Sequence, residues 1–252
     1  MTNQEAVFEY CLRIGDTSLI LGQRLAEWCG HGPILEEDIA LTNISLDLIG
    51  QTRGFYDYAC QVENKGRTED DLAFLRDDRD YRNLLMSEQP NGDFGQTILR
   101  QFLMSSYFSL FFAELAKSKD ETLAALAQKS LKEVQYHLRH SAEWMLRLGV
   151  GTEESARRMR LAVDELWLFT EDFFDTNEVD DVLLKAGIGV DNRMLRESWL
   201  SLVKSKMEEA HLSVPENSYA IRGSREGKHT EHLGHLLAEM QSLHRAHPGA
   251  TW

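Results

Sequence analysis

Apolar residues recur along most of this chain every three or four positions, which is the spacing of α-helices. In the first such segment they form one stripe, and glycine and alanine residues beside it allow close packing of a second helix. Glycine, proline or capping aspartate residues separate the segments. The pattern predicts helices over residues 4–29, 35–62, 94–118, 121–148, 153–174, 192–210 and 232–245.

The first four segments are long and form two pairs, each joined by a short turn, near His31 and near Lys119. Long helices joined by short turns pack as antiparallel hairpins. The sequence therefore predicts an all-α fold in a single domain spanning residues 1–252. Two helical hairpins form a four-helix bundle core over about 4–148, and further helices follow over about 153–252. The aromatic residues crowded into the third segment fit the core of this bundle.

The second predicted helix is apolar on two opposite faces. One face carries Ile44, Leu48 and Phe55. A helix that is apolar all round is normally buried on both sides. We therefore expect its second face to be covered either by the C-terminal helices or by another protein chain. That second face carries Ile39, Leu46 and Ile49.

Two of the predicted helices contain an incomplete metal-binding motif. In a ferritin-like bundle with a di-iron centre, two helices each supply a Glu-x-x-His pair and the other two each supply a Glu. The pair lies on one helix face, about one turn apart. This chain has Asp47-Leu-Ile-Gly50 and Glu133-Val-Gln-Tyr136, with glycine and tyrosine at the two histidine positions. The pattern is that of a ferritin-like oxygenase whose metal site has been lost.

Folding each hairpin at its turn aligns the remaining ligand positions. Asp16 comes level with Asp47 to within two or three residues, and Met104 or Ser105 comes level with Glu133. These positions offer at most three carboxylates and no histidine, whereas a di-iron centre needs about four carboxylates and two histidines. We therefore predict that the chain has no catalytic residue and binds no metal or cofactor. The vestigial slots are Asp16, Asp47, Gly50, Ser105, Glu133 and Tyr136.

The fourth predicted helix also places Glu133, His137 and His140 on one face. This triplet can hold a metal ion, or Glu133 can pair with His137 or with a neighbouring basic residue. We favour pairing, because no carboxylate lies level with the triplet on the third helix. A buried Asp47 is expected to act as a polar anchor that is hydrogen-bonded to Tyr58 or to a facing helix.

The segment from Arg222 to Thr230 is rich in glycine and cations, but it lacks the spacing of a phosphate-binding P-loop. It can hold an anion before the last helix, although we favour a solvated or subunit-contacting loop. His229, His232 and His235 follow at three-residue steps and can form a metal-binding face. We do not favour that reading, because no cluster of acidic residues matches them.

Composition excludes several classes of partner. The formal net charge of −14 disfavours binding to nucleic acid or to an anionic membrane. The N-terminus does not resemble a signal peptide, and the longest uncharged run is too short to span a bilayer. Cys11, Cys29 and Cys60 lack metal-site spacing and are expected to be free thiols. We therefore expect a soluble cytoplasmic protein.

Five segments occur in this order along the chain: LGQRLAEWCGHGP, NISLDLIGQ, EQPNGDFGQTI, KEVQYHLRHS and GKHTEHLGHLLAEMQ. Together they resemble the C-subunit family of ring-1,2-phenylacetyl-CoA epoxidases, and the match extends from about Ile14 to Trp252. The resemblance implies a metal-free ferritin-like subunit of a multicomponent oxygenase of aerobic phenylacetate breakdown. It further implies a paralogous A subunit, which carries the di-iron centre and binds the CoA thioester, and a reductase with flavin and an iron–sulfur cluster that uses NADPH.

The leading hypothesis is therefore a non-catalytic structural subunit that forms a tight hetero-oligomer with the A subunit. Its interface is expected on the first two hairpins, with residues 222–230 as a second contact. Two alternatives stay open. One is an independently active metalloenzyme with an unusual site, and the other is a free-standing helical protein that binds CoA. The unusual site would contain Asp16, Asp47, Glu133 and His137.

Overall fold

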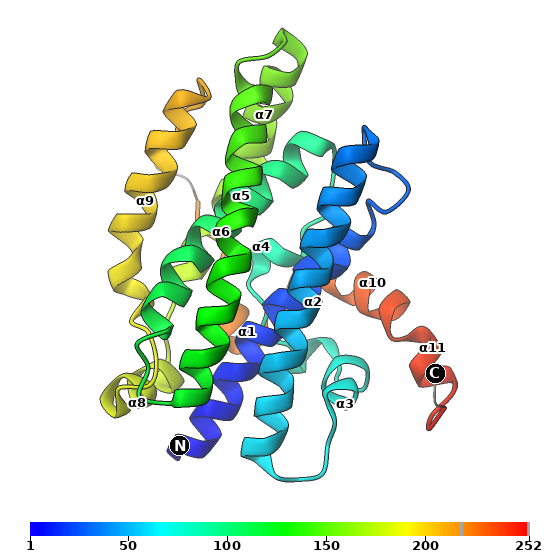
Figure 1. Cartoon of the computed structure of the whole chain (residues 1–252), viewed down its shortest axis with the longest axis vertical. Coiled ribbons are helices and arrows are strands. Elements are labelled where there is room, and N and C mark those ends of the chain that lie inside the picture. The colour runs from blue at the N-terminus through cyan, green and yellow to red at the C-terminus, as the bar shows by residue number, and fades with distance from the viewer. Residues whose placement is uncertain (217–218, 251–252) are drawn as a thin grey trace.

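A computed structural model of the chain describes residues 1–216 and 219–250, and every regular element in these residues is helical (Figure 1). The all-α prediction is confirmed. The elements are α1 (Asn3–Ala26), α2 (Leu35–Glu63), α3 (Glu69–Phe74), η1 (Asp78–Asp80), α4 (Leu85–Glu88), α5 (Phe94–Leu115), α6 (Glu121–Gly149), α7 (Glu153–Leu166), η2 (Trp167–Phe174), α8 (Glu178–Ala186), α9 (Asn192–Glu209), η3 (Ser224–Glu226), α10 (Glu231–Met240) and α11 (Ser242–Ala246).

Two antiparallel hairpins form the centre of the molecule, as predicted. Helices α1 and α2 approach closely because α1 presents small residues to α2. The Ser45 hydroxyl donates to the carbonyl of Gly22 at 2.8 Å, and a Cβ atom placed on Gly15 would lie 2.5 Å from the ring of Tyr56. Helices α5 and α6 form the second hairpin, in which the rings of Phe94 and Trp144 pack edge to face at 5.2 Å.

Aromatic side chains of α5 join the two hairpins. The ring of Phe112 stacks on that of Phe55 of α2, and Phe111 packs against Tyr10 of α1, both with centroids 6.1 Å apart. Phe112 also stacks on Phe108 at 5.3 Å. These side chains are buried, and each such pair stabilises by about 0.5–1.5 kcal/mol beyond its buried area. The aromatic run is core, as predicted.

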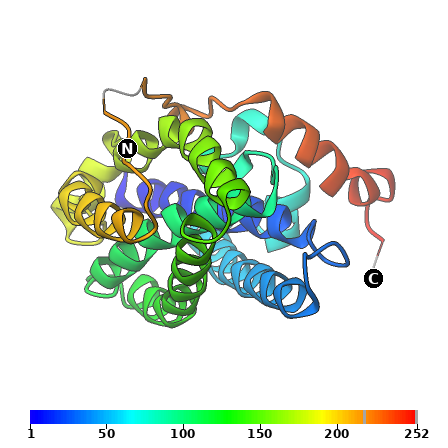
Figure 2. The ribbon, with the colours of Figure 1, turned by 90° about the horizontal axis from the view of Figure 1, so that it is seen from above.

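The later elements cover part of this bundle. Helices α7 and α9 pack on α5, and α8 packs on α1. The indole of Trp199 on α9 donates to the carbonyl of Leu103 at 3.2 Å. One hydrophobic core consequently includes residues from Ala6 to Leu237. Figure 2 shows α10 and α11 at one side of the bundle, with α11 reaching beyond the other helices.

The second face of α2 is not covered by the C-terminal helices. The exposed fractions of Ile39 and Leu46 are 52% and 62%. Ile49 does not belong to this exposed face, because its Cδ1 packs beside Gly22 of α1. In the part of the chain that the structure describes, no helix is both long enough and apolar enough to cross a membrane.

Candidate functional site

Asp16, the slot expected on α1, lies in a buried ion pair. Its carboxylate accepts hydrogen bonds from the hydroxyl of Tyr56 at 2.5 Å, from the guanidinium of Arg76 and from the backbone N–H of Arg82 at 2.7 Å. The Asp16 side chain is fully buried. Burial and the Asp16 charge hold the pKa of Tyr56 well above its usual value. Burial alone would lower the pKa of the Arg76 guanidinium. The negative charge of Asp16 outweighs this effect, and the pKa of Arg76 is raised.

The expected alignment of Asp16 with Asp47 is wrong. Ser45 bonds Gly22, and the hydroxyl of Thr52 donates to the carbonyl of Gly15 at 3.2 Å. These two contacts place Asp16 level with Gln51, which is four residues beyond Asp47 and therefore about 6 Å along the helix axis at 1.5 Å per residue. Asp16 also turns toward the segment after α3, because its cationic partner comes from there.

Polar side chains of α2 and α6 face each other along the line where these helices meet, which we call the α2–α6 seam. The His137 ring Nε2 lies 3.0 Å from a carboxylate oxygen of Asp47. The Gln51 amide donates to the Glu133 carboxylate at 2.9 Å. A third contact joins His140 of α6 to Glu37 of α2 at 2.8 Å.

The seam decides between the interpretations of these residues. The predicted shared face of Glu133, His137 and His140 is confirmed, since all three contact α2. The expected pairing of Glu133 with His137 or a basic neighbour is wrong, because the Glu133 carboxylate instead accepts a hydrogen bond from the amide of Gln51. Asp47 bonds a facing helix, one of its two expected anchors, although its side chain is 40% exposed. Tyr58, the other expected anchor, donates instead to Asp120 at 2.6 Å.

The remaining slots do not converge. Gly50 is exposed, and the side chain of Tyr136 points outward from α6 with 39% of its surface exposed. Ser105 is buried, but its hydroxyl accepts from the amide of Gln101, one turn away on α5, at 3.0 Å. Within residues 1–216 and 219–250, no group of three or more His, Cys, Asp or Glu side chains is placed to hold a metal ion. These residues therefore do not fit a di-iron centre.

The segment from Arg222 to Thr230 binds an anion of its own chain. Asp172, at the end of η2, accepts hydrogen bonds from the backbone N–H groups of Gly223 at 3.0 Å and Ser224 at 3.2 Å, and from the Ser224 hydroxyl at 2.9 Å. Arg222 pairs with Glu171 and Asp175 at 3.2 Å. The segment is therefore bound to its own chain and is not a wholly solvated loop, because Gly223, Ser224 and Gly227 are buried. Its expected contact with another subunit stays a prediction. The spacing of residues in the sequence does not indicate that Asp172, about 50 residues earlier in the chain, accepts hydrogen bonds from this loop.

The three histidines do not form a shared metal-binding face, which is the reading that the sequence did not favour. His229 is nearly buried and lies between a carboxylate oxygen of Glu88 at 2.8 Å and the carbonyl of Tyr81 at 3.0 Å. His235 is exposed on α10, and His232 is partly exposed. The three side chains thus lie in different environments. The contact between His229 and Glu88 could not be predicted from the spacing of histidines along one helix.

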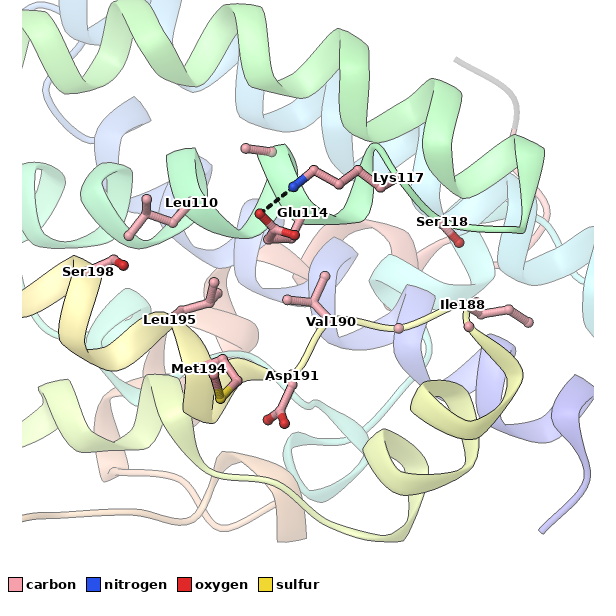
Figure 3. Close-up of a pocket in the computed structure, with 13 residues that line it drawn as sticks. Leu110, Glu114, Lys117, Ser118, Ile188, Val190, Asp191, Met194, Leu195 and Ser198 are labelled. Carbon is pink, nitrogen blue, oxygen red and sulfur yellow. Dashed lines mark hydrogen bonds and ion pairs between the residues drawn. The ribbon is translucent and has the colours of Figure 1, made fainter.

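A surface groove of about 490 Å³ lies between the end of α5 and the start of α9 (Figure 3). Leu110, Val190 and Leu195 contribute apolar surface. Glu114 and Lys117 of α5 form an ion pair at 2.6 Å beside it. The groove contains none of the predicted slots. Glu114, the carboxylate of α5 nearest to them in sequence, is thus paired at the surface.

The cysteines agree with the expected free thiols. Cys11 is buried, Cys29 is exposed and Cys60 is partly buried, and none forms a disulfide. Burial, together with the charge of Asp120, raises the pKa of the Cys11 thiol, so it stays protonated. It therefore packs as a small apolar side chain.

Comparison with known proteins agrees with the helical fold and with the resemblance in sequence. The family model described as "Phenylacetic acid catabolic protein" matches residues 1–252. The chain belongs to this family. It is also 49% identical over 243 residues to the C subunit of 1,2-phenylacetyl-CoA epoxidase from Escherichia coli (strain K12), a stretch that covers 96% of this chain and 98% of that protein.

In this member of the phenylacetic acid catabolic protein family, the segment EQPNGDFGQTI holds elements together. The amide of Asn91 donates to the carbonyl of Arg24 at the end of α1 at 2.7 Å. Asp93 caps α5 by accepting from the backbone N–H of Gln96 at 2.9 Å, which agrees with the capping aspartates expected between the helical segments. Glu88 contacts four polar groups of three residues, Asn83, His229 and Thr230, which belong to two segments of the chain. This segment therefore has a structural role in the fold.

Proposed function

We propose that this chain is the non-catalytic structural subunit of a multicomponent 1,2-phenylacetyl-CoA epoxidase of phenylacetate catabolism. It supports a paralogous A subunit that carries the di-iron centre and binds the CoA thioester. A reductase with flavin and an iron–sulfur cluster supplies electrons from NADPH to that subunit. The similarity to the C subunit of the Escherichia coli epoxidase supports this assignment.

The contacts across the α2–α6 seam carry the proposal. In a di-iron bundle the carboxylates of these two helices point at the metal ions. Here Asp47 is bonded to His137 and Glu133 is bonded to Gln51, so each carboxylate has a partner within the chain. Asp16 is held by Arg76 about one turn away from that level. The carboxylates at the positions of iron ligands thus form hydrogen bonds or ion pairs with side chains of the same chain.

The exposed side of α2 supports a role in an assembly. Leu35, Ile39 and Leu46 lie on one face of the helix, four and seven residues apart, and all are more than half exposed. Tyr136 of the neighbouring α6 is exposed as well. Single exposed apolar residues are common, but a row of them marks an interaction surface. A helical A subunit of the same family is the partner that we assign to this face.

The test is to purify the chain alone and together with the A subunit, and to measure iron and turnover of phenylacetyl-CoA in each sample. We expect no stoichiometric iron and no oxidation for the chain alone. The pair, given the reductase and NADPH, should contain iron and form the epoxide. Two irons per chain and turnover without the A subunit would overturn the proposal.

The same samples separate the two alternatives. An independent metalloenzyme requires that His137→Ala remove bound metal and activity while the fold persists, so normal turnover by the variant complex excludes it. Glu114→Gln is the matched control, because it changes a surface ion pair away from the seam. A free-standing CoA-binding protein requires that the isolated chain bind CoA in calorimetry and remain monomeric when mixed with the A subunit.

A further inference from the structure

The last two helices form an arm, residues 229–246, that is held at both ends. Leu233, Leu236 and Leu237 of α10 are buried. Near the end of the arm, the Gln241 amide donates to the carbonyls of Ala73 at 3.1 Å and Arg76 at 3.0 Å. The arm therefore covers the segment that supplies Arg76 to the buried Asp16. His229 is the contact at its beginning.

The geometry around His229 fixes where its protons lie. Nε2 is 3.0 Å from the backbone carbonyl oxygen of Tyr81. A carbonyl oxygen only accepts hydrogen bonds, so Nε2 carries a proton. Nδ1 is 2.8 Å from a carboxylate oxygen of Glu88. Whether Nδ1 also carries a proton depends on the ionisation of Glu88.

Glu88 is surrounded by donors. Its fully buried carboxylate accepts from the backbone N–H of Thr230 at 2.6 Å, from the Thr230 hydroxyl at 2.8 Å and from the amide of Asn83 at 2.8 Å. All three of these contacts use the Glu88 carboxyl group as an acceptor, as an ionised carboxylate does. An ionised Glu88 must receive a proton from Nδ1, so both ring nitrogens of His229 donate. His229 is therefore an imidazolium cation paired with a buried anion.

Neighbouring charges act on this pair in both directions. The carboxylate of Asp16 on α1 attracts the imidazolium. Two cations oppose it: Arg24 of α1 donates to the Glu88 backbone carbonyl at 2.8 Å, and Arg82 donates to the Tyr81 carbonyl at 2.7 Å. Burial alone lowers the pKa of His229, but Glu88, the Tyr81 carbonyl and Asp16 outweigh burial, and the net shift is upward.

We propose that His229 and Glu88 form a pH-dependent latch that holds the C-terminal arm against α4 and η1. A neutral imidazole has only one N–H, so loss of the proton breaks one of its two hydrogen bonds. It also leaves the Glu88 carboxylate buried without its cation, which is costly. The arm then opens locally while the bundle stays folded.

The direction of the pH effect follows from the raised pKa. The latch contributes its full stabilisation below the unfolded-state pKa of histidine, about 6.5, and loses it as the pH rises through the higher folded-state pKa. Each unit of upward shift corresponds to about a tenfold change in the opening equilibrium. Alkaline solution therefore weakens the arm.

Hydrogen exchange of the amides in residues 231–246 tests the latch on the whole chain. After correction for intrinsic exchange, we expect their protection to fall between about pH 6 and about pH 9, while α5 keeps its protection. His229→Gln should lower arm protection at about pH 6 and remove its pH dependence. His235→Gln, an exposed histidine on α10, should keep the wild-type profile.

Constant protection of the wild-type arm over this pH range would overturn the latch, and so would an unchanged pH profile in His229→Gln. Should that variant not fold, the ring nitrogen chemical shifts of wild-type His229 decide. At about pH 6 both nitrogens should show the shift of a protonated nitrogen. An unprotonated Nδ1 would overturn the proposal.

Discussion

Asp16 and Arg76 are isolated from solvent, so each depends on the other for compensation of its charge. The guanidinium also donates to the carbonyls of Leu72 at 2.6 Å and Asp80 at 3.1 Å, and its carbon lies 4.3 Å from the ring centroid of Tyr81. Removal of one partner from such a pair leaves a buried charge uncompensated, which costs more than the loss of a surface ion pair.

We expect Asp16→Asn to lower the free energy of unfolding by about 3–5 kcal/mol, because it leaves the Arg76 guanidinium buried without an anion. Tyr56→Phe removes one donor to Asp16 and should cost less, about 1–2 kcal/mol. Urea denaturation followed by circular dichroism measures both.

The control for this prediction is Glu114→Gln, which breaks a solvent-exposed pair with Lys117. It should change stability by less than about 1 kcal/mol. The double variant Asp16→Leu with Arg76→Met should recover most of the loss, since an apolar pair needs no compensation. Equal stability of Asp16→Asn and the wild type would contradict the role given to this ion pair.

The sequence revealed the weak ligand slots but not their partners. Gly50 and Tyr136 could be recognised as poor iron ligands from residue type alone. Whether Asp47 meets His137 depends on the offset between α2 and α6, which local spacing does not define. The Asp16 partner was missed for a similar reason, since Arg76 comes from an irregular segment after α3.

At the scale of helices, glycine is used in opposite ways in α1 and α2. A Cβ atom on Gly15 would meet the ring of Tyr56 at 2.5 Å. That ring is held in place because its hydroxyl group donates a hydrogen bond to Asp16 and accepts one from Arg76. A Cβ atom on Gly50 would meet nothing within 4 Å. Helix propensity alone favours alanine over glycine at both positions by about 1 kcal/mol.

We therefore expect Gly50→Ala to raise the free energy of unfolding by about 0.5–1 kcal/mol, while Gly15→Ala lowers it by about 1–3 kcal/mol through overpacking. The two variants make the same chemical change in neighbouring helices, so each is the control for the other. Thermal and urea denaturation measure the difference. Stabilisation by both would show that Tyr56 moves aside without cost.

Helix prediction succeeded where an apolar stripe was long and failed where the elements were short. The chain forms α8 between Asn177, which caps it, and Gly187, which ends it with a positive φ of 72°. Both signals are in the sequence, and a capping search would have found this helix. The helix predicted over 153–174 instead ends at Leu166, and η2 continues it as a tighter 3₁₀ helix with a run of buried aromatic residues.

At the scale of the whole molecule, the covering of the bundle is uneven. Helices α7, α8 and α9 cover α5 and α1, and the arm lies beside α4. The outward face of α2 keeps Leu35, Ile39 and Leu46 exposed. Sequence periodicity predicted that this face is apolar, but it could not tell whether the chain itself or a partner covers it.

The proposed assembly predicts that this face is needed for partner binding. Ile39→Asp combined with Leu46→Asp places two charges where an obligate interface would bury more than about 2,000 Å² in total. Both side chains are already exposed in the chain, so the variant should fold with wild-type stability. Its affinity for the A subunit should fall by at least about tenfold, which corresponds to about 1.4 kcal/mol. Co-purification with the A subunit and epoxidase activity should be lost as a result.

Met194→Asp combined with Leu243→Asp is the matched control, because these exposed apolar residues lie on α9 and α11, away from α2. It adds the same charge to a chain whose net charge is already −14, so general repulsion is equal in the two variants. Size-exclusion chromatography of each variant with the A subunit distinguishes them. Retention of the complex by the α2 variant, or loss of the complex by both, would remove α2 as the docking face, because only a contact made by α2 itself separates the two variants.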